Sequence, residues 1–378
     1  MQQQLKMKMR RIVLVYILML MVSFVWAQSN EFQEVNHFFD SINKVEKIQK
    51  IDAVFQEMVK VKNFSGAIIV GLDTELLYMN YNGYANWETK IKIEPNSTFE
   101  LASVSKQFTA VAILKLYEQG LLKLTDTIQK FIPDFPYRGI TIHHLLCHRS
   151  GLPEYFDFAE VYQKDDKTTM MDNDSLVRMM QIRRPKRLSR PDVKFEYNNT
   201  GYAILAKIVE IVSGQQFSDF VQENIFNPYG MSHSYFYLKG KGKDSLETAG
   251  HKSNYRVYKR DIQSGVYGDK GVFTTAEDMW NWNKALYAGK VLQDTTLQLA
   301  YTPKNKDMLP IYNYGYGWRL AVDADGDRLV FHGGLWNGNN TLFSRRLCDK
   351  SFVMIFSNVY NKSFGGRGDQ ILGILKEM

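Results

Sequence analysis

Residues 99–110 read Phe99-Glu100-Leu101-Ala102-Ser103-Val104-Ser105-Lys106-Gln107-Phe108-Thr109-Ala110. They place a serine at the start of an apolar helix and a lysine three positions later. One helical turn sets residues i and i+3 side by side, so the amine of Lys106 can reach the hydroxyl of Ser103 and accept its proton. The start of a helix also offers free backbone N–H groups and partial positive charge, which stabilise an oxyanion. The stretch therefore predicts a covalent serine nucleophile.

The same spelling occurs at Ser41-Ile42-Asn43-Lys44, so the surrounding sequence has to distinguish the two serines. Residues 31–62 carry an apolar stripe at helical spacing, and no strand leads into Ser41. Two strand-like runs, at 66–70 and 76–79, precede Ser103, and apolar residues at helical spacing follow it as far as Gly120. We therefore expect Ser103 to be the nucleophile and Ser41 to be an ordinary surface serine.

The order of the expected elements predicts an α/β (α+β) fold. Strand-like alternation at 66–79 returns after Gly317 and continues to Phe356, whereas 121–259 contains mostly helices and loops. Within the helical part Gly214 ends one helix, and beyond it Thr275 with Asp278 begins another. We expect an antiparallel sheet flanked by N- and C-terminal helices, with an inserted all-helical lobe. The expected α/β lobe covers about 40–115 and 265–378, and the helical lobe about 120–260.

The first segment is expected to be a signal peptide, residues 1–27. Four cations precede an apolar run from Ile12 to Trp26, and Val25-Trp26-Ala27 offers small residues at the positions that a signal peptidase reads. The run is shorter than the roughly 20 residues of a membrane span, so an uncleaved anchor is the second alternative. We expect cleavage near Ala27 and a periplasmic or secreted domain, 28–378, whose only membrane contact would be an uncleaved signal segment.

The net charge gives no reason to expect a nucleic-acid partner. The formal charge of +7 includes the four cations of the first segment, and without them 43 basic residues face 40 acidic ones. That balance is too even for electrostatic attraction to a polyanion.

A serine–lysine site needs a second proton-handling group and a wall that holds the substrate. Tyr197-Asn198-Asn199 places a phenol and an amide two residues apart, on a loop just before an apolar helix. Further along, His332-Gly333-Gly334-Leu335 loses its side chains at two consecutive strand positions, and a glycine in a strand often marks the close approach of a ligand or of another backbone. A plain glycine bulge is the alternative for the second segment.

Taken in order, Ser-x-x-Lys, Tyr-x-Asn and His-x-Gly resemble the serine β-lactamase and penicillin-binding superfamily, and most of all its class C β-lactamase, D-peptidase and esterase branch. The resemblance runs from about Phe64 to Asn358. It is carried by residues 99–110 together with three further stretches: Leu145-Leu146-Cys147-His148-Arg149-Ser150-Gly151-Leu152, Tyr197-Asn198-Asn199-Thr200-Gly201-Tyr202 and Tyr314-Gly315-Tyr316-Gly317-Trp318. It implies a β-lactamase/transpeptidase-like fold.

The resemblance also implies a role for each residue of the site. Ser103 would attack the carbonyl and become acylated, Lys106 would share its proton network, and Tyr197 would act as base and then as acid. Asn199 would hold Lys106 and the substrate amide. His332, Gly333, Gly334 and Leu335 would form the substrate-binding strand, with the backbone N–H groups of Ser103 and Leu335 as the oxyanion hole.

The third motif departs from the family pattern, because most β-lactamases have Lys-Thr-Gly or Lys-Ser-Gly there. A histidine is a cation only when it is protonated, and Gly333 has no hydroxyl to grip a substrate carboxylate. The predicted function is therefore an exported serine hydrolase that forms an acyl-enzyme with D-amino-acid peptides, amides, esters or, less well, β-lactams, with peptidoglycan fragments among the candidate substrates. The alternative is a penicillin-recognising sensor that is acylated but turns over poorly. We expect no cofactor and no metal.

Overall fold

The computed structural model describes residues 43–60, 64–162, 170–237, 246–260, 262–309, 311–361 and 365–376. The predicted signal peptide and Ser41 lie outside these residues, so the structure does not bear on either. No helix in the described ranges is long and apolar enough to cross a membrane.

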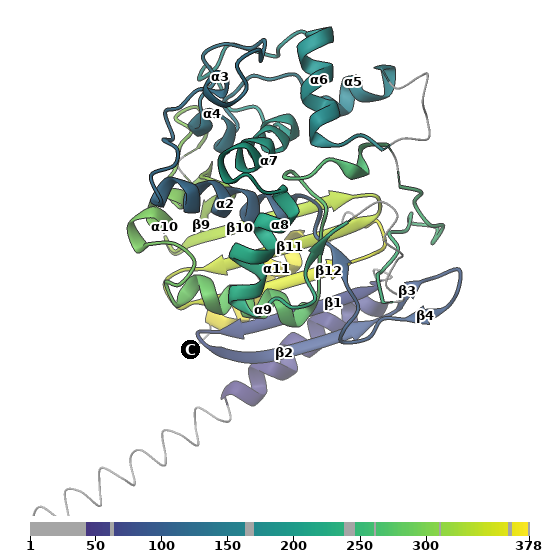
Figure 1. Ribbon diagram of the computed structural model, residues 1–378. Helices are drawn as coiled ribbons and strands as arrows, with labels where there is room; N and C mark the ends of the chain where they lie inside the picture. Colours follow the sequence, from purple (N-terminus) through teal and green to yellow (C-terminus); the bar gives the residue numbers. More distant parts are fainter. Residues whose placement is uncertain are drawn as a thin grey trace, which may run out of the picture.

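A seven-stranded antiparallel sheet forms the centre of the molecule (Figure 1). Its order, β2-β1-β12-β11-β10-β9-β8, pairs the first strand of the chain with the last, since Gly66 of β1 lies opposite Ser357 of β12. The strands are β1 Gly66–Leu72, β2 Glu75–Asn82, β8 Tyr312–Tyr314, β9 Arg319–Val322, β10 Arg328–Trp336, β11 Asn339–Arg346 and β12 Ser351–Ser357. The predicted antiparallel α/β architecture is confirmed.

Most of the secondary-structure elements between β2 and β8 are helices, and Figure 1 shows α2 to α7 gathered on one side of the sheet. In the described part of the chain between β2 and β8, the helical elements are the 3-10 helix η1 Ala102–Ser105, α2 Lys106–Glu118, α3 Ile128–Phe131, α4 Ile142–Leu146, α5 Tyr155–Tyr162, α6 Asn173–Arg183, α7 Asn199–Ser213 and α8 Phe217–Val221. They continue with η2 Gln222–Phe226, η3 Asn227–Tyr229, η4 Ile262–Gly265, α9 Ala276–Tyr287 and α10 Asp294–Ala300. The division of the chain into two lobes stays a prediction.

Short strands connect the helices to the central sheet. One small sheet joins β5 Phe99–Glu100, β7 Val272–Thr274 and β6 Tyr235–Phe236, and another joins β3 Tyr84–Asn86 and β4 Ile91–Lys92. The first of these pairs β5, which lies just before Ser103, with β7, which begins three residues after Asp269. The pairing of residue 99 with residue 274 thus brings two distant parts of the chain to the nucleophile.

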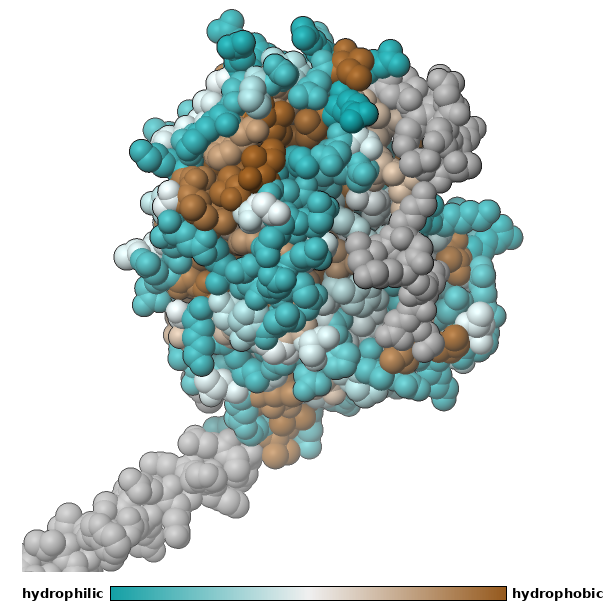
Figure 2. Space-filling view, in the orientation of Figure 1, coloured by the Kyte–Doolittle hydropathy of each residue, from teal (hydrophilic) through white to brown (hydrophobic). Residues whose placement is uncertain are grey.

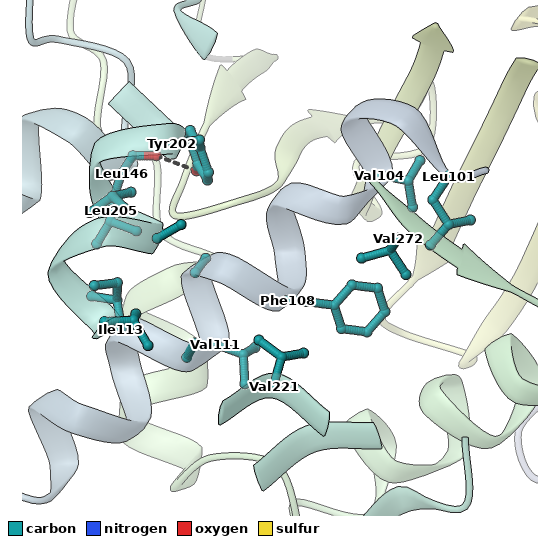
Figure 3. Packing of buried hydrophobic residues seen from close by; sticks show 14 of the residues in the cluster. Leu101, Val104, Phe108, Val111, Ile113, Leu146, Tyr202, Leu205, Val221 and Val272 are labelled. Carbon is teal, nitrogen blue, oxygen red and sulfur yellow. Dashed lines mark hydrogen bonds between the residues drawn. The ribbon is translucent and has the colours of Figure 1, made fainter. Parts of the chain in front are cut away.

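Alternation along the strands divides the apolar core between the two faces of the sheet. In β1, Ile68 and Val70 join a core made by residues 43–60 and α11 Gly365–Lys376, whereas Ala67 and Ile69 join the larger core on the other face. This larger core surrounds α2, whose Phe108 and Val111 are fully buried among neighbouring helices (Figure 3). The face seen in Figure 2 is mostly hydrophilic, with apolar residues in a few patches.

Candidate active site

The backbone around Ser103 is held in an unusual conformation. Ala102, the residue before it, has a φ of +49°, in the left-handed region that residues other than glycine seldom occupy. Two hydrogen bonds pin the preceding residue: Leu101 N donates to Val272 O over 2.8 Å, and Thr341 Oγ1 donates to Leu101 O over 2.7 Å. Such strain persists where the surroundings enforce it, and it is concentrated at active sites.

Lys106 lies at the start of α2 and is fully buried. Its Nζ atom lies 3.1 Å from Ser103 Oγ, 2.7 Å from Asn199 Oδ1 and 2.9 Å from Asp269 O. An ammonium has three N–H donors, so these three acceptors satisfy it completely. The structure thus brings together three predicted site residues, Ser103, Lys106 and Asn199, that the sequence separates by up to 96 positions.

The cap of α7 positions Tyr197 and Asn199 on either side of Asn198. Asn198 Oδ1 accepts a hydrogen bond from Gly201 N over 2.9 Å and so caps the helix. Its own backbone N–H donates to His148 Nδ1 over 3.1 Å, and the His148 ring packs against the Tyr197 ring at 4.3 Å between centroids. Lys106 Nζ lies 4.9 Å from the centre of the Tyr197 ring. Tyr197 therefore stands beside the serine–lysine pair.

The substrate-binding strand predicted from His332 to Leu335 is the end of β10, and its side chains alternate between two environments. Gly333, Gly334 and Leu335 line the cleft described below, whereas the His332 side chain is buried and does not line it. His332 Nδ1 lies 2.7 Å from Gly333 O, a carbonyl that can only accept, so Nδ1 carries the proton and Nε2 accepts from Tyr314 O–H over 3.1 Å.

Burial, together with the nearby charges of Arg319 and Lys106, holds the pKa of His332 well below its usual value. The side chain is therefore neutral, and it supports the layer beneath Tyr197 instead of presenting a cation to the substrate.

Gly334 is required by the close approach of the strand to the nucleophile loop. A Cβ atom at this position would lie 2.3 Å from both Leu101 O and Thr341 Oγ1. A Cβ atom at Gly333 would meet nothing closer than Thr341 O, at 3.8 Å. The two glycines thus have different functions: Gly334 permits the backbone contact, and Gly333 leaves the strand bare toward the cleft.

Several residues of the site were not predicted from the sequence. Asp269 accepts from Lys106 through its main-chain oxygen, and Glu154 Oε2 accepts from Asn199 N over 2.7 Å. Burial raises the pKa of Glu154 to about 7, partly offset by this hydrogen bond. Lys270 and Arg319 are further cations in the cleft wall. Neither Asp269 nor Lys270 belongs to a recognisable motif, whereas Arg319 directly follows a stretch that carries the resemblance and Glu154 comes two residues after another.

The cleft has a volume of about 520 Å³, and both Ser103 and Tyr197 open into it. Its lining includes Phe156 and Trp336, which stack with centroids 4.9 Å apart, together with Arg319 and Leu342. The site therefore combines a nucleophile, a buried ammonium and a phenol in a cleft of the size that binds small organic ligands. This combination provides for proton transfer to and from an attacking hydroxyl.

Fold and site together define a serine hydrolase of the β-lactamase-related type, and comparisons with known proteins agree. A family model described as Beta-lactamase matches residues 51–375, and the chain belongs to this family. It is similar to penicillin-binding protein 4* of Bacillus subtilis, with 29% identity over 333 residues that cover 83% of this chain and 72% of that protein.

Two solved structures show the same fold. One is a penicillin binding protein from Bacillus halodurans, with a TM-score of 0.75 and 25% identity, covering 86% of this chain and 98% of that one. The other is D-amino acid amidase from Ochrobactrum anthropi, with a TM-score of 0.74 and 22% identity, covering 88% and 99%.

Proposed function

We propose that this protein is an exported hydrolase of peptides or amides that passes through an acyl-enzyme on Ser103. The contact of Lys106 with both Ser103 and Asn199, inside a cleft that can hold a substrate, supports the proposal most directly. Ser103 Oγ would attack the scissile carbonyl while Tyr197 Oη takes its proton as base, and Tyr197 would then give that proton to the departing amine as acid, with the Lys106 ammonium held beside both groups. Water would then release the acyl group from Ser103.

Arg319 is the residue that we assign to a substrate carboxylate. His332 is neutral and buried and Gly333 has no side chain, so neither can hold an anion. Among the cations in the cleft wall, Lys270 forms an ion pair with Asp269, whereas no ion pair with an acidic group is found for Arg319 within the described ranges. Its guanidinium lies 5.2 Å from the Tyr197 ring and donates to Tyr312 Oη over 2.8 Å, so it is held at the cleft. A planar guanidinium matches a carboxylate in a bidentate manner.

The experiment uses the chain without residues 1–27 and three substrates: an acetylated D-Ala-D-Ala peptide, a D-aminoacyl amide and a p-nitrophenyl ester. We expect turnover of at least one, and a mass increase on Ser103 that equals the acyl group. Ser103→Ala should abolish both. Full activity in Ser103→Ala, or acylation of a different serine, would overturn the proposal.

Carboxylate recognition has a separate test. Arg319→Met should raise KM for the D-Ala-D-Ala peptide by about 10–100-fold, since a hydrogen bond to a charged group is worth about 1.5–3 kcal/mol. It should change KM little for the same peptide with an amidated end. Arg178→Met, at an exposed arginine on α6, is the matched control. An equal loss on both peptides would exclude a carboxylate contact.

The names of the relatives favour a second candidate, a penicillin-binding protein that is acylated but turns over poorly. A chromogenic cephalosporin separates the two. A burst of one equivalent without a steady rate, together with no turnover of the other substrates, would favour this candidate over the hydrolase.

A further inference from the structure

A second hollow lies on the outer face of the sheet, beside the catalytic cleft. It measures about 710 Å³ and lies between β9, β10, β11 and α11. Its wall is largely apolar and includes Ala321, Val322, Leu329, Phe331, Leu342 and Leu372. Val322 and Tyr312 at its edge keep 37% and 38% of their surface exposed, so apolar surface is open to solvent here.

The hollow exists because the two outer helices cover only part of the sheet. Residues 43–60 and α11 pack on β1 and β12, where Ile68, Val70, Val353 and Ile355 are fully buried. Leu329 and Leu342 lie at the edge of that core and stay partly exposed. Beyond them, within the described ranges, the outward side chains of β9 and β10 have no helix above them.

The hollow is continuous with the catalytic cleft, since Arg319, Gly333 and Leu342 line both. Along β10, Leu329 and Phe331 line the hollow and Gly334 and Leu335 line the cleft, whereas Gly333 lines both and a Cβ atom there would meet nothing closer than 3.8 Å. The absence of a side chain at this position leaves the passage unobstructed. A group that enters the cleft beside Arg319 can therefore extend into the hollow.

Of the six charged groups that line the hollow, four are already in ion pairs, and within the described ranges only Arg319 and Asp369 are not. Lys376 forms ion pairs with Asp323, Asp325 and Asp327, and Arg346 pairs with Asp349. Away from Arg319 and Asp369, an occupant would meet a mostly apolar wall, and it would gain free energy from burying apolar surface.

We infer that this hollow is a binding subsite for a large apolar side chain on the residue that bears the substrate carboxylate. Arg319 stands at the boundary, so a carboxylate held there places its neighbouring side chain at the passage by Gly333. The inference rests on the proposed function, in particular on a peptide whose carboxylate-bearing residue departs as the amine. The subsite predicts a higher kcat/KM for peptides whose departing residue is as large as leucine or phenylalanine than for peptides that release alanine.

The test compares acetyl-D-Ala-D-Ala, acetyl-D-Ala-D-Leu and acetyl-D-Ala-D-Phe on the chain without residues 1–27. We expect kcat/KM to rise at least about tenfold from the alanine to the phenylalanine peptide, because even one methylene in an apolar pocket is worth roughly tenfold or more. Each peptide is also measured as a competitive inhibitor of p-nitrophenyl ester hydrolysis, so a peptide that is not cleaved still reports its affinity.

Ala321→Phe fills the hollow and should remove the preference while leaving the alanine peptide within about twofold. Leu329→Asn makes the wall polar without adding volume, and it should weaken the same preference. Ile91→Phe is the control, because it adds a similar apolar group at an exposed position of β4, which does not line the hollow. Ester hydrolysis confirms that each variant is folded.

The outcomes distinguish the subsite from the proposed function. Equal kcat/KM and equal inhibition constants for the three peptides would overturn the subsite while leaving acylation of Ser103 intact. Absence of any acyl adduct would instead overturn the proposed function. A dimer in sedimentation that Ala321→Phe dissociates would show that a second copy of the chain covers the hollow, and it would also overturn the subsite.

Discussion

The ammonium of Lys106 lies 3.1 Å from the hydroxyl of Ser103, within the reach that proton transfer requires. Asn199 and the main-chain oxygen of Asp269 take the other two N–H donors, so the ammonium cannot turn away from the serine without losing a buried hydrogen bond. The pair is therefore held in place before any substrate arrives.

Replacement of Lys106 by methionine should lower kcat/KM for the ester by about 10²–10⁴-fold, the usual contribution of a positioned proton-transfer group. Methionine keeps most of the apolar stem but offers no N–H to Ser103. Lys115→Met is the matched control, because Lys115 lies on the same helix and its Nζ contacts Tyr229. A variant at 106 that retains the rate of the control would remove Lys106 from the proton network of Ser103.

Tyr197→Phe tests the phenol without disturbing the ring. The His148 contact at 4.3 Å and the Lys106 contact at 4.9 Å both involve the ring, so the variant should fold normally. We expect a loss of about 10²-fold or more in the acylation rate, measured by stopped flow, since only the hydroxyl is removed. Tyr117→Phe, at an exposed position of α2, controls for the substitution itself. An unchanged acylation rate would remove Tyr197 from the mechanism.

The two glycines of β10 should respond differently to alanine. Gly334→Ala places a Cβ atom 2.3 Å from backbone and side-chain oxygens, and we expect it to lower the free energy of unfolding by about 1–3 kcal/mol. At Gly333 the added Cβ atom has open space, so the loss should stay below about 1 kcal/mol. Urea unfolding of both variants measures the difference, and equal losses would contradict the close approach at Gly334.

The sequence predicted the sheet and the helix around Ser103 because their signals are local. Thr275 does begin α9, where its hydroxyl accepts from Asp278 N over 3.1 Å, and Gly214 does end α7 in the left-handed conformation. The periodic apolar runs correctly located β1, β2 and the strands after Gly317. Turns, caps and periodicity each depend on a few neighbouring residues, so they can be predicted without knowledge of the tertiary structure.

The rest of the site could not be predicted because it depends on distant contacts. Asp269 acts through its main-chain oxygen, which every residue type possesses. Glu154 matters through its burial beside Asn199, and burial follows only from the packing of α5 against the start of α7. The lowered pKa of His332 likewise depends first on its burial and then on the charges of Arg319 and Lys106, which lie far apart in the sequence.

Glu154 should make the protein less stable as the pH rises. Burial raises its folded-state pKa to about 7, above the roughly 4.3 of an unfolded glutamate. The native state therefore holds the proton more tightly, and stability that is fully present below about pH 4 is lost as the pH approaches 7. Glu154→Gln keeps an acceptor for Asn199 N–H but has no carboxyl group to ionise. At pH 8 its free energy of unfolding should therefore exceed that of the unmodified protein by up to about 3 kcal/mol more than at low pH.

Urea unfolding at pH 4.5 and pH 8 gives the free energy of unfolding of Glu154→Gln and of the unmodified protein. The gain is the change, between the two pH values, in the difference between the two proteins. Glu94→Gln, at an exposed glutamate, should show no such change. If the advantage of Glu154→Gln is the same at both pH values, Glu154 is ionised normally in the folded protein.

His332 should have the opposite effect on the acid side. Its folded-state pKa is held well below the roughly 6.5 of an unfolded histidine, so the unfolded chain binds a proton that the native state rejects. Stability should therefore fall as the pH drops below about 6.5. His332→Gln retains a side-chain amide near Tyr314 but cannot titrate, so its stability relative to the unmodified protein should improve from pH 8 to pH 5. His233, whose side chain is 55% exposed, supplies the control variant His233→Gln. If the stability of His332→Gln relative to the unmodified protein does not change with pH, the buried imidazole accepts a proton as readily as an unfolded one. His332 beneath Tyr197 would then carry a charge at acid pH.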